Sequence, residues 1–470
     1  MASTVTLPLW LFILILLFAA VTFASHFLFP SVRWFFRRRL ERAVSELNQR
    51  LDRPIRPFKL ARRYDTIQRL SYDPEVMRAV SQHARAEGIP ENVAAELSRR
   101  YAREIVPSFS ASAYFGFAIR AARFLSNALY RVRLGHYDAA GLAAIDPDAT
   151  VVFVMNHRSN MDYVLVTYLA AERSALSYAV GEWAQVWPLS RLIRAMGAYF
   201  IRRRSRNELY RKVLARYVQM ATEAGVTQAM FPEGGLSRSG ALMPPKLGLL
   251  KYIITSSGED HPDVVFVPVA LNYDRVLEDR ALIAAAQDPG HRFNAGLGVV
   301  ARNALGLLWR RLAGRYHRFG YAAVSFGAPV SLRAFADGVA GDPTRPLAQT
   351  LMRRIGDIVP ILPVPLIAWL ILERGAQSQA ELERGINQVA RQLPDAHIHL
   401  PRDSRGYTAE TGLRQLTHRG ALCEVDGRFA AIPKERPLLE YYASSIRHLM
   451  PAELPRDSAG ANESAATAGS

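Results

Sequence analysis

The sequence of 470 residues contains a single cysteine, Cys423. One cysteine excludes an internal disulfide framework and any zinc site built from several thiolates. Acidic residues are also in deficit, because 42 Asp and Glu stand against 59 Lys and Arg, which gives a formal net charge of +17. A positive balance of this size attracts anionic partners, which include nucleic acids, acidic lipid headgroups, acidic carrier proteins and phosphorylated substrates.

Charged residues are absent from Leu7 to Ser25, and the apolar character continues to Phe29. A helix needs about 20 apolar residues to cross a bilayer core, so this run predicts a transmembrane anchor within residues 1–32. A cleaved signal peptide is the alternative, but no Lys or Arg precedes the run, and the run exceeds a normal signal core. Five arginines follow between residues 33 and 42, which predicts a cytoplasmic location for the rest of the chain.

The surroundings of this run favour lipid as the anionic partner. An aromatic cluster at residues 34–36 suits the headgroup layer, and the neighbouring arginines suit an anionic lipid surface. The sequence has no zinc-finger spacing and no aromatic RNA-binding signature, so we predict a membrane lipid partner and no nucleic acid.

The pattern of apolar residues predicts four further regions after the anchor. Residues 33–134 are expected to be helical, with a helix start at Asp73-Pro74-Glu75 and a break at Pro107. Residues 135–335 are predicted to form an α/β domain, and residues 336–456 a second helical region. Within the latter, residues 358–372 are apolar but too short for a span, so we expect a buried or interfacial segment. Residues 457–470 are polar and small, which predicts a disordered tail.

Short β-branched and aromatic runs predict buried strands in the middle region, with helical patterns such as 208–223 between most of them. This alternation predicts an α/β fold in which a mixed sheet is flanked by helices. The predicted strands are 151–155, 175–180, 197–201, 227–231, 264–271 and 321–326.

The stretch 156–163 begins where the first of these strands ends, which is the edge of an α/β sheet where ligands bind. Ser159 and Asp162 match the capping-box pattern, so Asp162 is expected in the first turn of a helix and His157 on the loop before it. An imidazole beside a carboxylate is a base with its orienting group. A polar histidine beside a capping acid is the simpler interpretation of the same residues.

Three further stretches carry polar or special residues. Residues 231–240 follow a strand and contain Gly234 and Gly235, which permit close backbone approach, with Ser237 and Arg238 able to contact a phosphate. Lys246 can add a point charge there. Residues 197–204 run from a strand into consecutive arginines. Pro268 lies inside a predicted strand, which indicates an edge or a pocket-lining position. A glycine turn and a solvated basic face are the simpler interpretations.

The order of these stretches resembles the four sequence blocks of the glycerolipid acyltransferase superfamily. His157 and Asp162 with four residues between them (the HX4D motif) come first, followed by 197–203, 231–238 and 267–269. Within the superfamily the chain is most similar to glycerol-3-phosphate 1-O-acyltransferase and its dihydroxyacetone-phosphate relative. It departs from them in its shorter length, in Asn160 where a histidine is common, and in the 272–274 sequence. These departures bear on the choice of acceptor.

The resemblance implies transfer of a fatty-acyl group from acyl-CoA or acyl carrier protein to glycerol 3-phosphate, with these thioesters as co-substrates and no cofactor or metal. It implies that His157 is the general base and that Asp162 holds it. The implied phosphate site contains Arg202, Arg203, Ser237, Arg238 and Lys246, with Glu233, Gly234 and Gly235 shaping the pocket. Oligomeric state is not implied.

Several other functions are weighed against this one. Acylation of 1-acyl-glycerol 3-phosphate or of dihydroxyacetone phosphate would use the same machinery, and a lipid-binding membrane protein would bind without turnover. A serine hydrolase needs a G-x-S-x-G elbow, whose last glycine is missing after Ser237. A condensation-type transferase would need paired histidines. A metal site at Asp395, His397 and His399 has no evident third strong ligand.

Overall fold

The computed structural model describes residues 8–23, 38, 42, 44–170, 175–181, 189–202, 207–256, 258, 261–288, 319–393 and 405–451. Two compact units are formed, one by Met1–Ile55 with Glu172–Ser174 and the other by Arg56–Ala171 with Ala175–Ser470. The first unit contains α1 (Leu9–Phe23), a helix without a charged residue. Across all described residues, no helix combines the length and the apolar character required to cross a membrane. The candidate tail at 457–470 lies outside the described residues.

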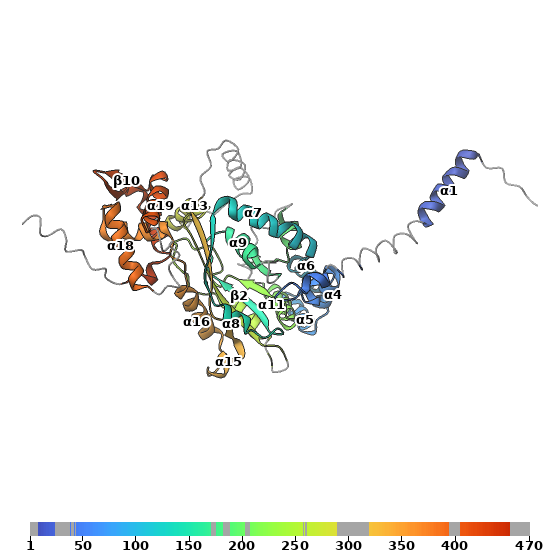
Figure 1. Cartoon of the computed structure of the whole chain (residues 1–470). Coiled ribbons are helices and arrows are strands. Elements are labelled where there is room, and N and C mark those ends of the chain that lie inside the picture. Colours follow the sequence, from blue (N-terminus) through green and yellow to red (C-terminus); the bar gives the residue numbers. More distant parts are fainter. Residues whose placement is uncertain are drawn as a thin grey trace, which may run out of the picture. The chain divides into compact units, whose positions relative to one another are not determined.

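The second unit is organised around a sheet whose described strands run in the order β1-β7-β6-β2-β5-β3-β4, with β8 also paired to β6 (Figure 1). Neighbouring strands are parallel except that β6 is antiparallel to β7 and to β8, so the predicted mixed sheet is confirmed. The strands are β1 (Arg131–Tyr137), β2 (Thr150–Met155), β3 (Ser177–Gly181), β4 (Tyr199–Ile201), β5 (Gln228–Met230), β6 (Val264–Tyr273), β7 (Tyr321–Phe326) and β8 (Val330–Ser331).

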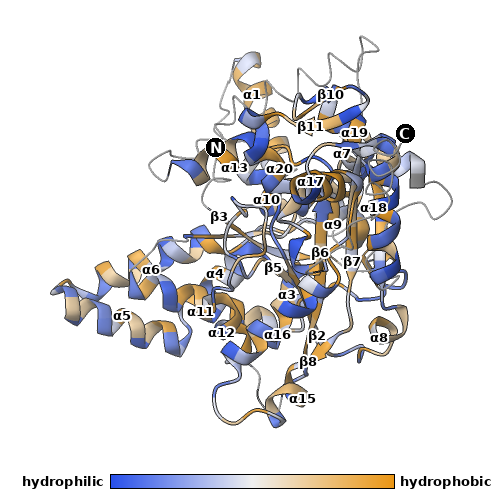
Figure 2. Cartoon of the chain, turned by 90° about the vertical axis from the view of Figure 1, so that its left-hand side faces the viewer, coloured by the Kyte–Doolittle hydropathy of each residue, from blue (hydrophilic) through white to orange (hydrophobic). Residues whose placement is uncertain are grey.

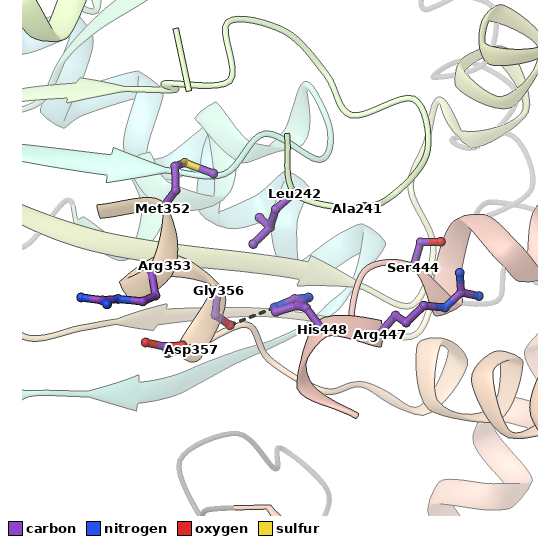
Figure 3. Close-up of a pocket in the computed structure, with 9 residues that line it drawn as sticks. All are labelled: Ala241, Leu242, Met352, Arg353, Gly356, Asp357, Ser444, Arg447 and His448. Atoms are coloured by element: carbon purple, nitrogen blue, oxygen red, sulfur yellow. Dashed lines mark hydrogen bonds between the residues drawn. The ribbon is translucent and has the colours of Figure 1, made fainter. Parts of the chain in front are cut away.

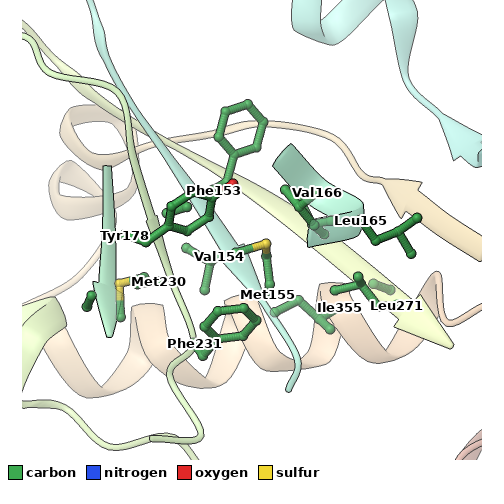
Figure 4. Close-up of a cluster of buried hydrophobic side chains, with 14 of the residues drawn as sticks. Phe153, Val154, Met155, Leu165, Val166, Tyr178, Met230, Phe231, Leu271 and Ile355 are labelled. Carbon is green, nitrogen blue, oxygen red and sulfur yellow. The ribbon is translucent and has the colours of Figure 1, made fainter. Parts of the chain in front are cut away.

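The central strand β2 shows why the sheet forms. Its sequence TVVFVM is buried at every position, as expected for a parallel strand that has helices on both faces. Figure 4 shows the side chains of Val154 and Met155 in one cluster with Leu165 of a helix and Ile355 of another. The sheet therefore forms the core that fixes the loop following β2.

The six predicted strands are confirmed, but the helical prediction over residues 33–134 was wrong at its end. The helix there stops at Leu129, and residues 131–137 form the edge strand β1, parallel to β7. Only two of these seven residues, Val132 and Leu134, are aliphatic, and Leu134 is exposed, so the strand carries little hydrophobic signal.

Pro268 lies inside the sheet, so the edge option of its prediction was wrong. On one side β6 pairs with β2, and Pro268 is opposite Val154. On the other side β6 pairs with β8 through residue 266 and with β7 from Val269 onward. Pro268 falls between these two partners, where its carbonyl accepts the Gly327 N–H at 2.8 Å. A missing N–H is tolerated here because one partner strand is exchanged for the next.

Helices cover both faces of the sheet (Figure 1). In the N-terminal region α5 begins as predicted, with the Asp73 side chain accepting the Glu75 N–H and Pro74 in the first turn. Figure 2 shows α5, α6 and α11 side by side, and these helices pack against one another. In the second unit, the described helices up to residue 287 are α3 (Pro57–Leu60), α4 (Arg63–Ser71), α5 (Pro74–Glu87), α6 (Glu91–Ile105), η2 (Ser112–Ala118, a π-helix), α7 (Ile119–Leu129), α8 (Ala139–Ala143), α9 (Met161–Ala170), α10 (Leu189–Ala195), α11 (Glu208–Glu223), α12 (Gly248–Ile254) and α13 (Asp279–Gln287).

The C-terminal region is mostly helical, as predicted, with a small antiparallel sheet in the order β10-β11-β9 that the sequence did not reveal. Within the predicted segment 358–372, helix α17 is buried along nearly its whole length. The elements are α15 (Leu332–Asp337), α16 (Thr344–Asp357), α17 (Pro363–Arg374), β9 (Gln377–Ser378), α18 (Gln379–Gln392), α19 (Arg405–His418), β10 (Leu422–Val425), β11 (Arg428–Ala431), η5 (Pro433–Glu435), α20 (Arg436–Ala443) and η6 (Arg447–Leu449).

Asp274, immediately after β6, connects the sheet to this C-terminal region. Its two carboxylate oxygens accept the N–H groups of Val364, in the first turn of α17, and of Tyr321, at the start of β7. Burial raises the pKa of Asp274 to about 7. Asp274 thus caps the start of the buried helix α17. It directly follows β6, whose last residue reaches the candidate active site.

Candidate active site

The loop between β2 and α9 is held to the sheet by Asn156. Its side-chain amide donates to the Leu271 carbonyl at 3.0 Å, and its side-chain oxygen accepts the Leu271 N–H at 2.8 Å. Asn156 therefore continues the pairing of β2 with β6 beyond the last residue of β2. His157 follows directly, at the carboxyl end of a central strand, where ligands bind in α/β sheets.

His157 and Asp162 form a buried pair. The His157 Nδ1 and the Asp162 Oδ2 are 2.9 Å apart, and the two side chains are 1% and 0% exposed. The same oxygen accepts the N–H groups of Arg158 at 2.7 Å and Ser159 at 3.0 Å. Asp162 lies in the first turn of α9, as the capping pattern predicted. The Asp162 carboxylate thus both caps the N-terminus of α9 and orients the imidazole of His157.

Tyr273, the last residue of β6, holds the other oxygen of this carboxylate. Its hydroxyl donates to Asp162 Oδ1 at 2.7 Å, and both residues are fully buried. The sequence prediction did not include Tyr273, because its distance from Asp162 along the chain gives no local signal. Its position after a predicted buried strand, within the unusual 272–274 sequence, was the available indication.

We expect Tyr273→Phe to lower kcat by roughly 3- to 10-fold, because a lost hydrogen bond is worth about 0.5–1.5 kcal/mol. The substitution keeps the ring, so KM for the acceptor should change little. Steady-state kinetics on the purified variant measures both quantities. An unchanged kcat would mean that the Tyr273 hydroxyl has no part in orienting His157 through Asp162.

The imidazole of His157 lies among aromatic rings. It stacks on Phe231 at a centroid distance of 4.0 Å and meets Tyr163 edge-on at 5.6 Å. Within the described part of the chain, its Nε2 has no hydrogen-bond partner, so this nitrogen can accept a proton when Nδ1 donates to Asp162. Since the His157 side chain is only 1% exposed, neighbouring side chains must move aside before an acceptor hydroxyl can reach Nε2.

The 231–246 loop makes hydrogen bonds to both the N–H and the carbonyl of His157. The His157 N–H donates to Glu233 Oε1 at 3.1 Å, and the His157 carbonyl accepts the Ser237 N–H at 3.0 Å. The Ser237 hydroxyl donates to the Ala241 carbonyl at 2.6 Å. The structure therefore shows Glu233 and Ser237, both predicted to bind or shape the substrate site, in contact with the backbone of the candidate base.

Glu233 should make stability depend on pH. Burial raises its pKa to about 8, from an ordinary value of 4.5. The folded chain then binds a proton that the unfolded chain releases, so the stabilising contribution is complete below pH 4.5 and is lost as pH rises through 8. Relative to Glu233→Gln, the free energy of unfolding of the unaltered chain should fall between about pH 5 and pH 9. Urea titrations of both proteins at several pH values measure this difference, and parallel profiles would contradict it.

The remaining predicted residues of this loop lie on its exposed side. Gly234 has a φ of +68°, and the Lys246 side chain crosses it so closely that a Cβ there would lie 2.7 Å from Lys246 Cδ. Gly235 follows in the same half-buried turn. Arg238 is exposed, and its Nη1 donates to the Ala285 carbonyl at 3.2 Å. The loop thus presents two cations while its inner side holds His157.

Arg202, at the end of β4, is engaged by another residue. Its Nε and Nη2 donate to the two oxygens of Glu104 on α6 at 2.9 and 2.6 Å. The guanidinium also lies over the rings of Tyr101 and Tyr210. The Glu104 carboxylate raises the pKa of Arg202 above its ordinary value. A phosphate would have to displace Glu104, which the sequence could not reveal. Arg203 lies outside the described residues.

Two further residues support the HX4D loop and were missed by sequence reasoning. Arg158 is only 2% exposed; its Nη1 donates to the Gly240 carbonyl, and its guanidinium lies 5.0 Å from the ring centre of Tyr441 on α20. Glu278 accepts the Ser159 hydroxyl at 2.8 Å and the Asn160 N–H at 3.3 Å. The C-terminal region therefore packs onto the same loop that carries His157.

A cavity of about 480 Å³ is lined in part by residues 241 and 242 of the 231–246 loop and includes neither His157 nor Asp162. Figure 3 shows the side chain of Leu242 and the ring of His448 close to Gly356, and the His448 Nε2 lies 3.1 Å from the Gly356 carbonyl. The lining residues are Ala241, Leu242, Met352, Arg353, Gly356, Asp357, Ser444, Arg447 and His448. Neither Pro268 nor any other predicted site residue is among them.

In the described part of the chain, no group of three His, Cys, Asp or Glu residues is placed to hold an ion. The candidate metal residues Asp395, His397 and His399 lie outside the described residues.

Comparison with known families places two matches on this chain. Residues 137–272 match the family described as Acyltransferase, and residues 303–453 match the Glycerol-3-phosphate acyltransferase C-terminal region. The first match contains the HX4D pair, the 231–246 loop and nearly all of β6. The predicted resemblance to the glycerolipid acyltransferase superfamily is confirmed.

Curated relatives carry the name glycerol-3-phosphate acyltransferase. The protein from Pseudomonas putida KT2440 is 26% identical over 419 residues, which cover 83% of this chain and 49% of that protein. The protein from Pseudomonas entomophila L48 is 28% identical over 422 residues, with the same coverage. The chain therefore spans about half the length of the curated relatives that it matches. A solved structure, the 1-acyl-sn-glycerophosphate acyltransferase PlsC from Thermotoga maritima, aligns over 55% of this chain and 80% of that chain with 17% identity and a TM-score of 0.32, too weak a likeness to argue from.

Proposed function

We propose that this chain, which carries an acyltransferase domain over residues 137–272, transfers a fatty-acyl group from an acyl thioester to the sn-1 hydroxyl of glycerol 3-phosphate. The observation that carries the proposal is the buried His157–Asp162 pair, 2.9 Å apart at the carboxyl end of β2. Acyl-CoA and acyl carrier protein both present the required thioester, and the reaction needs no resident cofactor.

In the proposed reaction His157 Nε2 takes the proton of the acceptor hydroxyl while Nδ1 donates to Asp162. The hydroxyl oxygen attacks the thioester carbonyl, the C–S bond breaks as the ester C–O bond forms, and the thiolate receives the proton from the imidazolium. Asp162 stabilises the charged ring during this exchange. No acyl-enzyme is formed, so the Ser237 hydroxyl has no chemical part.

Support for glycerol 3-phosphate as acceptor comes from the names of the relatives and from the C-terminal match at residues 303–453. We assign the acceptor phosphate to Arg238 and Lys246, the cations presented by the loop that also holds His157. Gly234 allows Lys246 to lie across the loop backbone. Arg202 can join them if a phosphate replaces Glu104 as its partner, and Arg203 follows it in the sequence.

The acceptor is tested directly on the membrane fraction that contains the chain. This fraction is supplied first with labelled acyl-CoA and then with acyl carrier protein that bears a labelled acyl group. Glycerol 3-phosphate, dihydroxyacetone phosphate and 1-acyl-glycerol 3-phosphate are offered separately. The proposal expects lysophosphatidate as the product from glycerol 3-phosphate. If only 1-acyl-glycerol 3-phosphate gave a labelled product, it would be the acceptor and the proposal of glycerol 3-phosphate would be wrong. Binding of phosphatidate without turnover of any acceptor would indicate a lipid-binding protein.

A membrane location is also proposed, with the uncharged run that contains α1 as a single anchor and the second unit on the cytoplasmic side. The absence of charge along α1 and the arginines that follow it support this orientation. Cys423, the single cysteine, is partly exposed and reports the side of the membrane. In intact spheroplasts a membrane-impermeant maleimide should leave it unlabelled until the membrane is permeabilised, and labelling before that step would reverse the orientation.

A further inference from the structure

The helix formed by η2 and α7 presents apolar side chains to solvent. Phe117 is 59% exposed, Phe124 is 63% exposed and Leu125 is 40% exposed. Phe117 and Phe124 are seven residues apart, so they lie on one side of the helix, two turns from each other. A contiguous exposed apolar patch that is rimmed by polar residues marks an interaction site for a protein or a membrane.

The opposite side of the same helix is used for packing within the second unit. Tyr114, Ala118, Ala122 and Leu129 are buried at helical spacing, and α7 packs against α9. The Tyr114 hydroxyl accepts the Leu176 N–H at 3.1 Å, which fixes the start of the helix to the segment before β3. The helix is therefore anchored through its inner side, and the exposed phenylalanines belong to a second, outward face.

The charge of this outward face has one sign. Arg120 and Arg123 are exposed between the two phenylalanines, and Arg123 lies 6.0 Å from the ring centre of Tyr168 on α9. No Asp or Glu occurs between Ile105 and Tyr137, a stretch that contains Arg120, Arg123, Arg131 and Arg133. Aromatic side chains beside arginines, without acidic residues, are typical of helices that lie in the interface of an anionic membrane.

We propose that the outward face of η2 and α7, formed by Phe117, Arg120 and Phe124, docks on an anionic lipid bilayer. This docking surface is separate from α1, and its test requires no catalytic activity. The phenylalanines enter the headgroup and acyl boundary, and the arginines contact lipid phosphates. Because α7 packs on α9, whose first turn contains Asp162, docking holds the candidate active site beside the lipid surface.

The experiment uses the full chain with Cys423→Ser and one new cysteine that carries a nitroxide spin label. Ala121→Cys places the label on the docking surface without removing a phenylalanine. Val93→Cys on α6, where Val93 is 51% exposed, is the matched control. The proteins are bound to vesicles of phosphatidylglycerol or of phosphatidylcholine, and collision rates with oxygen and with a water-soluble nickel chelate are compared.

On phosphatidylglycerol we expect oxygen to exceed the nickel chelate at residue 121 and the reverse at residue 93. The substitutions Phe117→Ser with Phe124→Ser, and Arg120→Glu with Arg123→Glu, should each return residue 121 to the aqueous pattern. Both pairs lie at exposed positions, and circular dichroism checks that the variants fold. Equal patterns at 121 and 93, an aqueous pattern at 121 in the unaltered background, or spin–spin broadening that shows a second copy on this face would overturn the proposal.

Discussion

Replacing His157 by alanine should lower kcat by about 10²- to 10⁴-fold, the contribution expected of a positioned general base. The imidazole is held by Asp162 on one nitrogen and stacked on Phe231, so the substitution removes both the base and its fixed position. KM for the acceptor should change far less, because the cations proposed to hold the phosphate lie on another loop. Steady-state rates with glycerol 3-phosphate and acyl donor measure both values.

The His157→Ala protein is expected to fold. Asp162 keeps the N–H groups of Arg158 and Ser159 and the Tyr273 hydroxyl as donors, so its charge remains solvated by the protein. The matched control is His261→Ala, since His261 is exposed on a loop before β6. That variant should retain full activity. If His157→Ala transferred acyl groups at a rate close to that of the control, the proposed role of His157 would be wrong.

The sheet and the loop that carries His157 were predictable because their signals are local. The buried strands carry continuous β-branched and aromatic runs, and Ser159 with Asp162 marks a helix start within four residues. These two facts place His157 at the carboxyl end of β2 without knowledge of any other contact. The edge strand β1 has no such run, and its partner β7 is nearly two hundred residues away in the sequence. No local signal therefore indicated that residues 131–137 form a strand.

The contacts that surround the loop could not be predicted because each joins distant parts of the chain. The Tyr273 hydroxyl at the end of β6 donates to Asp162, and Glu104 of α6 pairs with Arg202. The sequence predicted Glu233 and Ser237 as site residues from their place beside the glycines, but it could not show that they hold the backbone of His157. Residue type thus indicated which loops approach one another, while the direction of each side chain depended on packing.

Two substitutions of Asp162 should separate its structural part from its catalytic part. Asp162→Ala leaves two buried N–H groups, on Arg158 and Ser159, without their acceptor and removes the partner of the Tyr273 hydroxyl. Breaking a buried charged network costs about 3–5 kcal/mol, so we expect this variant to unfold at distinctly lower urea concentration and to lose activity. Urea titration followed by circular dichroism measures the loss.

Asp162→Asn should keep most of the stability and still lose activity. The amide oxygen can accept the same N–H groups, and the amide nitrogen can donate to the Tyr273 oxygen, whose hydroxyl hydrogen can rotate away. The neutral amide cannot stabilise the imidazolium that forms when His157 takes a proton, so kcat should fall by about 10²- to 10⁴-fold. The control is Asp65→Asn, because Asp65 is also in the first turn of a helix but is exposed. If Asp162→Asn lost as much stability as Asp162→Ala, the carboxylate charge would be needed for folding. If Asp162→Asn kept its kcat, the carboxylate charge would have no part in catalysis.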